Sequence, residues 1–63
     1  MFKVYHWDTF DNETIMVGGP FKTLDEAIDF VQDHYGARLT HTGADKVDIV
    51  NEVGSVVKSY RVG

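Results

Sequence analysis

The strongest constraint on the fold is an amphipathic helix that the sequence predicts over about residues 24–35. Thr23 and Glu26 have the spacing of a capping box, which satisfies free backbone N–H groups at a helix start. Gly36 stands where a left-handed residue commonly ends a helix. The apolar residues recur at helical spacing as one stripe, widened by Phe30: Leu24, Ala27, Ile28, Val31 and Tyr35. A helix with a single apolar stripe must bury it against another element.

The residues before this helix predict a hairpin. "FKVYHW", residues 2–7, is rich in aromatic and β-branched residues, and "ETIMVGG", residues 13–19, reads as a second strand. The intervening "DTFDNE" supplies Asp and Asn side chains, which bond the local backbone and favour turns. Alternation along the first strand defines two faces, one with Phe2, Val4 and His6, the other with Lys3, Tyr5 and Trp7.

A second hairpin is predicted after the helix. "KVDIV" and "SVVKSYRV" flank "NEVG", in which Asn51 and Gly54 can adopt the positive φ angles of a tight turn. Residues 37–45 have weak periodicity and are expected to connect the helix to this hairpin. The expected core-facing positions of the two strands are Val47 and Ile49 on one, and Val56, Tyr60 and Val62 on the other.

These elements predict one α+β domain over residues 1–63, a single four-stranded antiparallel sheet of chain order β-β-α-β-β with one helix on one face. A chain of 63 residues buries a small share of its surface, so its stability is marginal without further support. The sequence has no cysteine, which excludes disulfides and thiolate-bound zinc. Stability is therefore expected from a well-packed core or from homodimer formation.

The element order and two short motifs are similar to a loose group of small uncharacterised bacterial and phage proteins. In that group a T-x-x-E-A helix precedes a V-x-I-x-(N/D)-x-x-G-x-V hairpin. The first motif is matched by Thr23, Glu26 and Ala27, and the second by Val47, Ile49, Asn51, Gly54 and Val56. The resemblance covers roughly residues 20–62, implies the β-β-α-β-β fold, and carries no activity.

The charge of the chain is negative and unevenly distributed. The formal net charge is −4, and residues 1–36 carry two Lys against seven carboxylates. Direct nucleic-acid binding is not expected, because contacts to phosphate backbones require clustered Lys and Arg. No apolar run approaches the roughly 18 residues of a membrane span, and "MFKVYHWD" lacks the order of a signal peptide. A cytoplasmic protein without membrane association is the expectation.

The outer side of the predicted helix carries a row of carboxylates: Asp25, Glu26, Asp29 and Asp33. Like charges four residues apart cost a few tenths of a kcal/mol per pair in a helix. One interpretation is a solvated face that keeps a small protein soluble. The other is an acidic ridge that docks on a basic partner, such as a nucleic-acid-binding protein whose phosphate groove the ridge mimics.

The sheet face away from the helix is the second candidate surface. One helix covers one side of a sheet, and the other side is expected to carry an apolar patch made of Tyr5, Trp7, Val17, Val50 and Val57. Contiguous apolar patches mark interaction sites, so this face could bind a protein partner or a second copy of the chain. The alternative is that Trp7 folds over the sheet edge and leaves only a small patch.

The stretch "YHWDTFDNE" raises the question of a metal site. His6, Asp8 and Asp11 are possible ligands for a divalent metal, with a fourth from His34 or His41. We favour the simpler interpretation, in which Asp8 and Asp11 form a turn and His6 lies half-buried on a strand, so no metal or cofactor is predicted. A chain this small rarely encloses a pocket of about 300 Å³ or more, and no catalytic residue is predicted.

The sequence therefore predicts a non-enzymatic protein-interaction module that self-associates and binds a partner through its acidic helix or its open sheet face. The alternative is a small inhibitor, of the kind that phages and mobile elements encode, that mimics nucleic acid with the acidic ridge. A metal-binding domain built on His6 is a third and weaker hypothesis.

Overall fold

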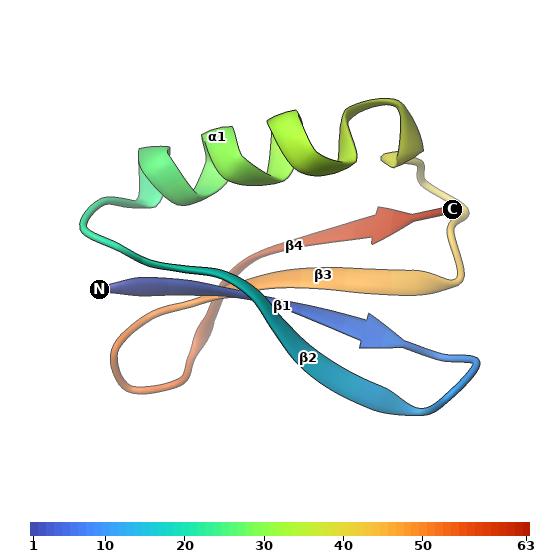
Figure 1. The fold of residues 1–63 in the computed structure, drawn as a ribbon, viewed down its shortest axis with the longest axis horizontal. Coiled ribbons are helices and arrows are strands. Elements are labelled where there is room, and N and C mark those ends of the chain that lie inside the picture. The colour runs from blue at the N-terminus through green and yellow to red at the C-terminus, as the bar shows by residue number, and fades with distance from the viewer.

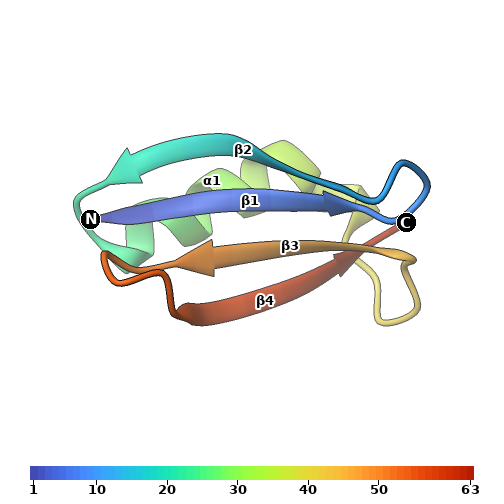
Figure 2. The ribbon, with the colours of Figure 1, turned by 90° about the horizontal axis from the view of Figure 1, so that it is seen from below.

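Two hairpins and one helix make up residues 1–63, all of which the computed structural model describes (Figure 1). Strands β1 (Phe2–Asp8) and β2 (Glu13–Phe21) precede α1 (Leu24–Tyr35) and a short 3₁₀ turn, Gly36–Arg38. Strands β3 (Asp45–Val50) and β4 (Val56–Val62) follow. The sheet order is β2-β1-β3-β4 with every neighbouring pair antiparallel, and α1 crosses one face (Figure 2). The predicted α+β architecture is confirmed.

The helix begins as the sequence predicts. The Thr23 hydroxyl accepts a hydrogen bond from the Glu26 backbone N–H at 3.2 Å, which satisfies one of the free donors of the first turn. At the other end the Gly36 N–H donates to the Gln32 carbonyl. Gly36 has a φ of 10° and leads into the 3₁₀ turn, so the expected left-handed cap is wrong. The chain continues winding there because residues 36–38 keep local hydrogen bonds, ending with Leu39 N–H on Gly36 O.

The core lies between α1 and the sheet. Its buried residues come from the apolar stripe of the helix and from strands β1, β3 and β4: Val4, Ala27, Val31, Tyr35, Val47, Ile49 and Val62. Burying a side chain such as Val or Ile fully contributes roughly 1.5–3 kcal/mol relative to exposure. Most of these residues lie on α1 and on the central strands β1 and β3, so this small domain depends on a few tightly packed side chains.

A bulge in β2 changes which residues face the helix. The register shifts between the pairs Val4–Gly18 and Tyr5–Met16, so Val17 is the extra residue and packs against the core. The prediction that Val17 lies on the open face is therefore wrong, and Met16 occupies that face opposite Tyr5. Gly18 permits the bulge to sit under the helix, because a Cβ there would lie 2.7 Å from the Phe30 ring.

The pairing of β4 with β3 is also irregular. The register shifts between the pairs Ile49–Lys58 and Val50–Val56. Because cross-strand partners share a face, Val56 lies with Val50 on the open side and is 55 % exposed. The expectation that Val56 faces the core is wrong, whereas Tyr60 and Val62 do face α1.

Candidate functional site

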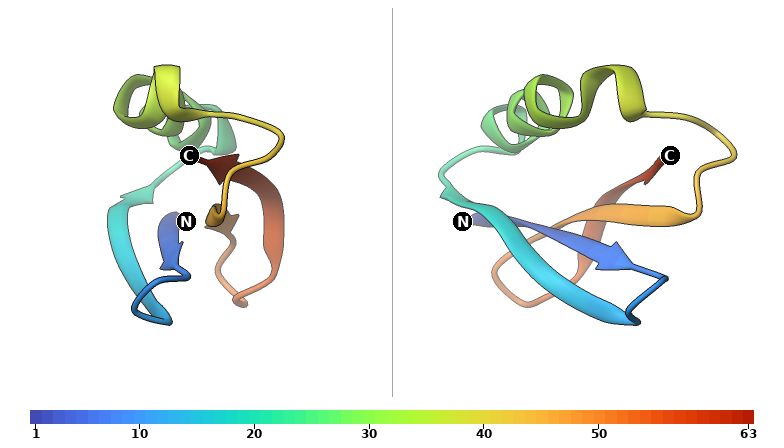
Figure 3. Two further views of the ribbon diagram at one scale, coloured as in Figure 1. Left: turned by 90° about the vertical axis from the view of Figure 1, so that its right-hand side faces the viewer. Right: turned by 45° about the vertical axis from the view of Figure 1, so that its right-hand side comes forward.

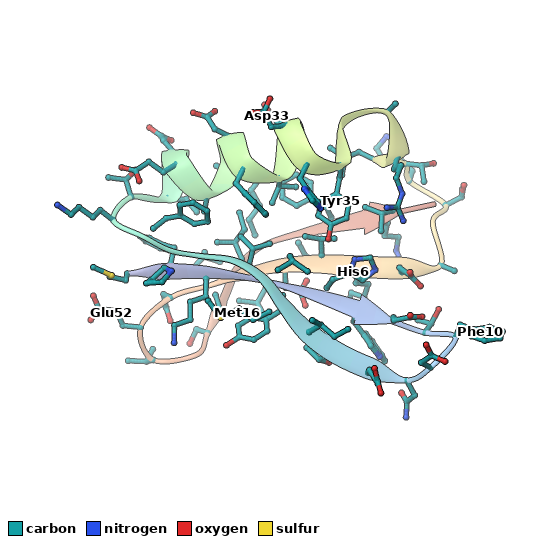
Figure 4. All side chains as sticks on the ribbon, in the orientation of Figure 1. His6, Phe10, Met16, Asp33, Tyr35 and Glu52 are labelled. Carbon is teal, nitrogen blue, oxygen red and sulfur yellow. The ribbon has the colours of Figure 1, made fainter.

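The outer face of α1 carries the predicted carboxylates. Asp25, Glu26, Asp29 and Asp33 are all exposed, and Asp33 points away from the sheet (Figure 4). We call these four residues the acidic ridge. None of them forms an ion pair, since the two ion pairs of the molecule are the N-terminus with Glu52 and His6 with Asp45. With a rise of about 1.5 Å per residue, the ridge extends about 12 Å from Asp25 to Asp33.

The open sheet face lies on the opposite side of the molecule from the acidic ridge. Two rows of cross-strand neighbours cross it, one with Trp7, Lys46 and Arg61, the other with Met16, Tyr5, Asp48 and Ser59. Trp7 is 38 % exposed. Its strand, β1, lies between β2 and β3, so Trp7 does not fold over a sheet edge. The Lys46 ammonium lies 5.8 Å from the centre of its ring, a cation–π contact.

The open sheet face is less apolar than the sequence predicts. Tyr5, Trp7 and Val50 lie on it, and Val57 joins them by alternation with Ser59. Charged and polar side chains separate these residues, because Lys3 pairs with Val50 and Asp48 with Tyr5. Sequence reasoning missed Met16 on this face and also Phe10, which is 94 % exposed at the tip of the β1–β2 hairpin (Figure 4).

His6 links three elements through its side chain. Its Nε2 lies 3.0 Å from Asp45 Oδ2 at the start of β3. Its Nδ1 lies 2.9 Å from the hydroxyl of Tyr35 at the end of α1, and Figure 4 shows the two side chains pointing toward each other. An ionised carboxylate only accepts hydrogen bonds, so Nε2 carries the proton. In the neutral ring Nδ1 then accepts from the Tyr35 O–H. We call His6, Tyr35 and Asp45 the His6 cluster, and its hydrogen bonds fasten the end of the helix to the sheet.

Asp45 completes the His6 cluster with two further contacts. Its Oδ1 accepts from the Thr9 N–H at 3.2 Å and from the Thr9 hydroxyl at 2.9 Å. The hydrogen bond from His6 is the main reason that the pKa of Asp45 lies below its ordinary value, and the Thr9 bonds lower it further. Burial raises the pKa of Tyr35 above its ordinary value. The sequence contains no signal for this cluster, because Asp45 lies 39 residues from His6.

Asp8 stabilises the turn that follows β1. Asp8 Oδ1 accepts hydrogen bonds from the backbone N–H groups of Phe10 and Asp11, at 2.9 and 3.4 Å, and Asn12 takes a positive φ of 54°. The hydrogen-bond partners of His6 are therefore Tyr35 and Asp45, and Asp8 and Asp11 belong to the turn. No group of three or more His, Cys, Asp or Glu side chains could hold a metal ion.

Buried Tyr35 and partly buried Tyr60 give a matched test of the His6 cluster. Tyr35→Phe removes the bond to His6 and leaves Nδ1 without a partner, so it should cost about 1–3 kcal/mol of unfolding free energy. The Tyr60 hydroxyl is buried without any partner, so Tyr60→Phe should be neutral or stabilising. Urea denaturation measures both, and equal destabilisation by the two substitutions would contradict the role given to the Tyr35 hydroxyl.

The His6 cluster also predicts a dependence of stability on acid. Because the pKa of Asp45 is lowered in the fold, its contribution to stability is fully present above its ordinary pKa of 3.8. That contribution should disappear as the pH falls from about 4 through the lowered pKa. Urea midpoints between pH 5 and pH 2 should fall less steeply in Asp45→Asn than in the parent chain, and parallel slopes would show that Asp45 is not involved.

The comparisons with known proteins give no relative for this chain. No protein-family model, curated protein or solved structure matches it. The similarity to small bacterial and phage proteins thus stays a prediction. The single α-helix has 12 residues, and no helix is long and apolar enough to cross a membrane.

Proposed function

We propose that this chain is a non-enzymatic protein-interaction module that docks on a basic surface of a partner protein through the acidic ridge. The observation that carries the proposal is that its four carboxylates are exposed, lie on one element and have no cationic partner. A field of one sign attracts a complementary surface, raises association rates and selects against other partners. The cysteine-free sequence is compatible with the cytoplasm, where we place this module.

The helix supports a docking surface better than the open sheet face does. The helix is anchored by its buried face, by its N-cap Thr23 and by the His6 cluster, so the ridge is held rigidly. A rigid surface loses less conformational freedom on binding, so the entropic cost of binding is lower. The alternative form of this proposal is that the partner is a nucleic-acid-binding protein. The acidic ridge would then mimic the phosphates of the nucleic acid.

Charge reversal on the ridge tests the proposal. The ridge variant carries Asp25→Lys and Asp29→Lys. The control, the hairpin variant, carries Asp11→Lys and Glu13→Lys at exposed positions of the β1–β2 hairpin, and it changes the net charge by the same amount. Tagged versions of both variants and of the parent chain are used to capture partners at matched salt. A partner held by the parent and the hairpin variant but lost from the ridge variant supports the proposal. Equal capture by the ridge variant would overturn it, and competition by DNA would identify mimicry.

Self-association through the open sheet face is a second candidate function. It is favoured by the exposed apolar side chains on that side, Trp7, Met16, Val56 and Val57. Light scattering across concentration at low and high salt measures it. A dimer that persists in high salt and is lost in Trp7→Ala supports this candidate, and a monomer at every concentration contradicts it.

A further inference from the structure

A surface groove runs beside the edge strand β4. It has a volume of about 800 Å³ and is lined by Leu39, Thr40, His41, Lys46, Ser59, Tyr60 and Arg61. One wall is the segment that follows the 3₁₀ turn, and Figure 3 shows this segment passing close to the end of β4. We call this feature the β4 groove. The acidic ridge and the His6 cluster contribute no residue to it.

The walls of the β4 groove are held by backbone contacts. The Thr40 N–H donates to the Arg61 carbonyl at 3.0 Å, and the Gly63 N–H donates to the Arg38 carbonyl at 2.9 Å. Leu39 forms an isolated bridge with Val62. Gly43 packs so closely on Val62 that a Cβ would lie 2.3 Å from its backbone. The groove is therefore part of the folded structure and does not depend on a mobile loop.

The charge of the β4 groove is opposite to that of the chain as a whole. Lys46 and Arg61 are directly opposite each other on β3 and β4, and His41 lines the same groove. Like charges in this cross-strand position are destabilising, and neither cation has a carboxylate partner. No carboxylate lines the groove, although the chain has a net charge of −4. A bound anion would remove the repulsion between the two cations.

The donors of the β4 groove suit an oxyanion. One guanidinium nitrogen of Arg61, Nη1, donates to the Gly43 carbonyl at 3.2 Å, which orients the group and leaves its other N–H groups available. A fixed guanidinium beside an ammonium group binds phosphate through short, charge-assisted hydrogen bonds. The Ser59 hydroxyl donates to Asp48 at 2.6 Å, so it is not a donor to a ligand. Asp48 lies two residues from Lys46 on the same face of β3, and its charge opposes anion binding.

We propose that the β4 groove binds the phosphate group of a small phosphomonoester, with Lys46 and Arg61 as its ligands. A volume of about 800 Å³ is far larger than a phosphate ion needs and lies within the range of small-molecule sites. The side chains of Leu39 and Tyr60 line the same groove and supply apolar and aromatic surface for the organic group. This inference is independent of the acidic ridge and of the proposed function.

The test uses phenyl phosphate, with inorganic phosphate and sodium chloride at matched ionic strength as comparisons. Trp7 is the single tryptophan and Lys46 contacts its ring, so fluorescence reports binding, and amide chemical shifts locate it. We expect saturable shifts at Lys46, Arg61 and His41, and tighter binding of phenyl phosphate than of inorganic phosphate. Equal binding of the two phosphates would overturn the assignment of an organic group, and changes that sodium chloride reproduces would overturn the site.

Two matched substitutions locate the charge that matters. Lys46→Gln should raise the dissociation constant tenfold or more. Lys3→Gln removes the same charge from another part of the open sheet face, and its dissociation constant should stay within twofold of that of the parent chain. Asp48→Asn should lower the dissociation constant, because it removes the opposing charge and keeps an acceptor for Ser59. Equal effects of Lys46→Gln and Lys3→Gln would show non-specific attraction and overturn the proposal. Circular dichroism checks that each variant is folded.

Discussion

Gly43→Ala is expected to destabilise the chain by about 3 kcal/mol or more, among the largest effects of any single substitution. A Cβ at this position would lie 2.3 Å from the carbonyl carbon and oxygen of Val62. Both atoms belong to the backbone of β4, whose Val62 side chain is 1 % exposed, so neither can move aside without opening the core. A domain of this size has roughly 3–5 kcal/mol of stability, so much of the variant should be unfolded at 25 °C.

Gly36→Ala is the control for this prediction, since no atom lies within 4 Å of the position of its added Cβ. It should change the unfolding free energy by no more than about 1 kcal/mol, the usual scale of a Gly–Ala exchange near a helix. Urea titrations followed by circular dichroism compare the two variants. If Gly43→Ala were as stable as Gly36→Ala, the close packing of residues 39–43 on β4 would be wrong, and the wall of the β4 groove with it.

Ile49→Ala should cost about 2–5 kcal/mol of unfolding free energy. Ile49 is completely buried on the central strand β3, beneath α1, and its removal leaves a cavity that a rigid sheet cannot fill. Val53→Ala is the matched control, because Val53 lies in the β3–β4 turn and is 83 % exposed. That control should stay within about 0.5 kcal/mol of the parent in the same urea titration. A loss below about 1 kcal/mol for Ile49→Ala would contradict the position of the core.

The sequence predicted the elements whose signals are local. The capping box of Thr23 and Glu26 and the apolar stripe located the helix within a residue of its observed bounds, Leu24–Tyr35. In the β3–β4 turn Gly54 takes the expected positive φ, 83°, but Asn51 does not. Asn51 acts through its side chain instead, which accepts hydrogen bonds from the N–H groups of Val53 and Ser55. Such signals can be recognised in the sequence because the hydrogen-bonding partners lie within four positions of each other in the chain.

Features that depend on distant contacts were not predictable. The bulge at Val17 moves one residue from the open face to the core, and it depends on Gly18 making room for the Phe30 ring. The His6 cluster joins residues 29 and 39 positions apart. The β4 groove arises where the connecting segment meets β4, and this segment has no periodicity of its own. Strict alternation therefore placed Val17 and Val56 on the wrong faces, because bulges in β2 and β4 change the faces on which they lie.

Amide chemical-shift mapping with a captured basic partner is the most direct test of our proposal that the acidic ridge is the surface that binds a partner. We expect the largest shifts to cluster along α1, at Asp25, Glu26, Asp29 and Asp33. We also expect that raising the salt concentration weakens the complex, because exposed charges are screened. Shifts that cluster instead on the open sheet face, around Trp7 and Met16, and persist at high salt would contradict the proposal.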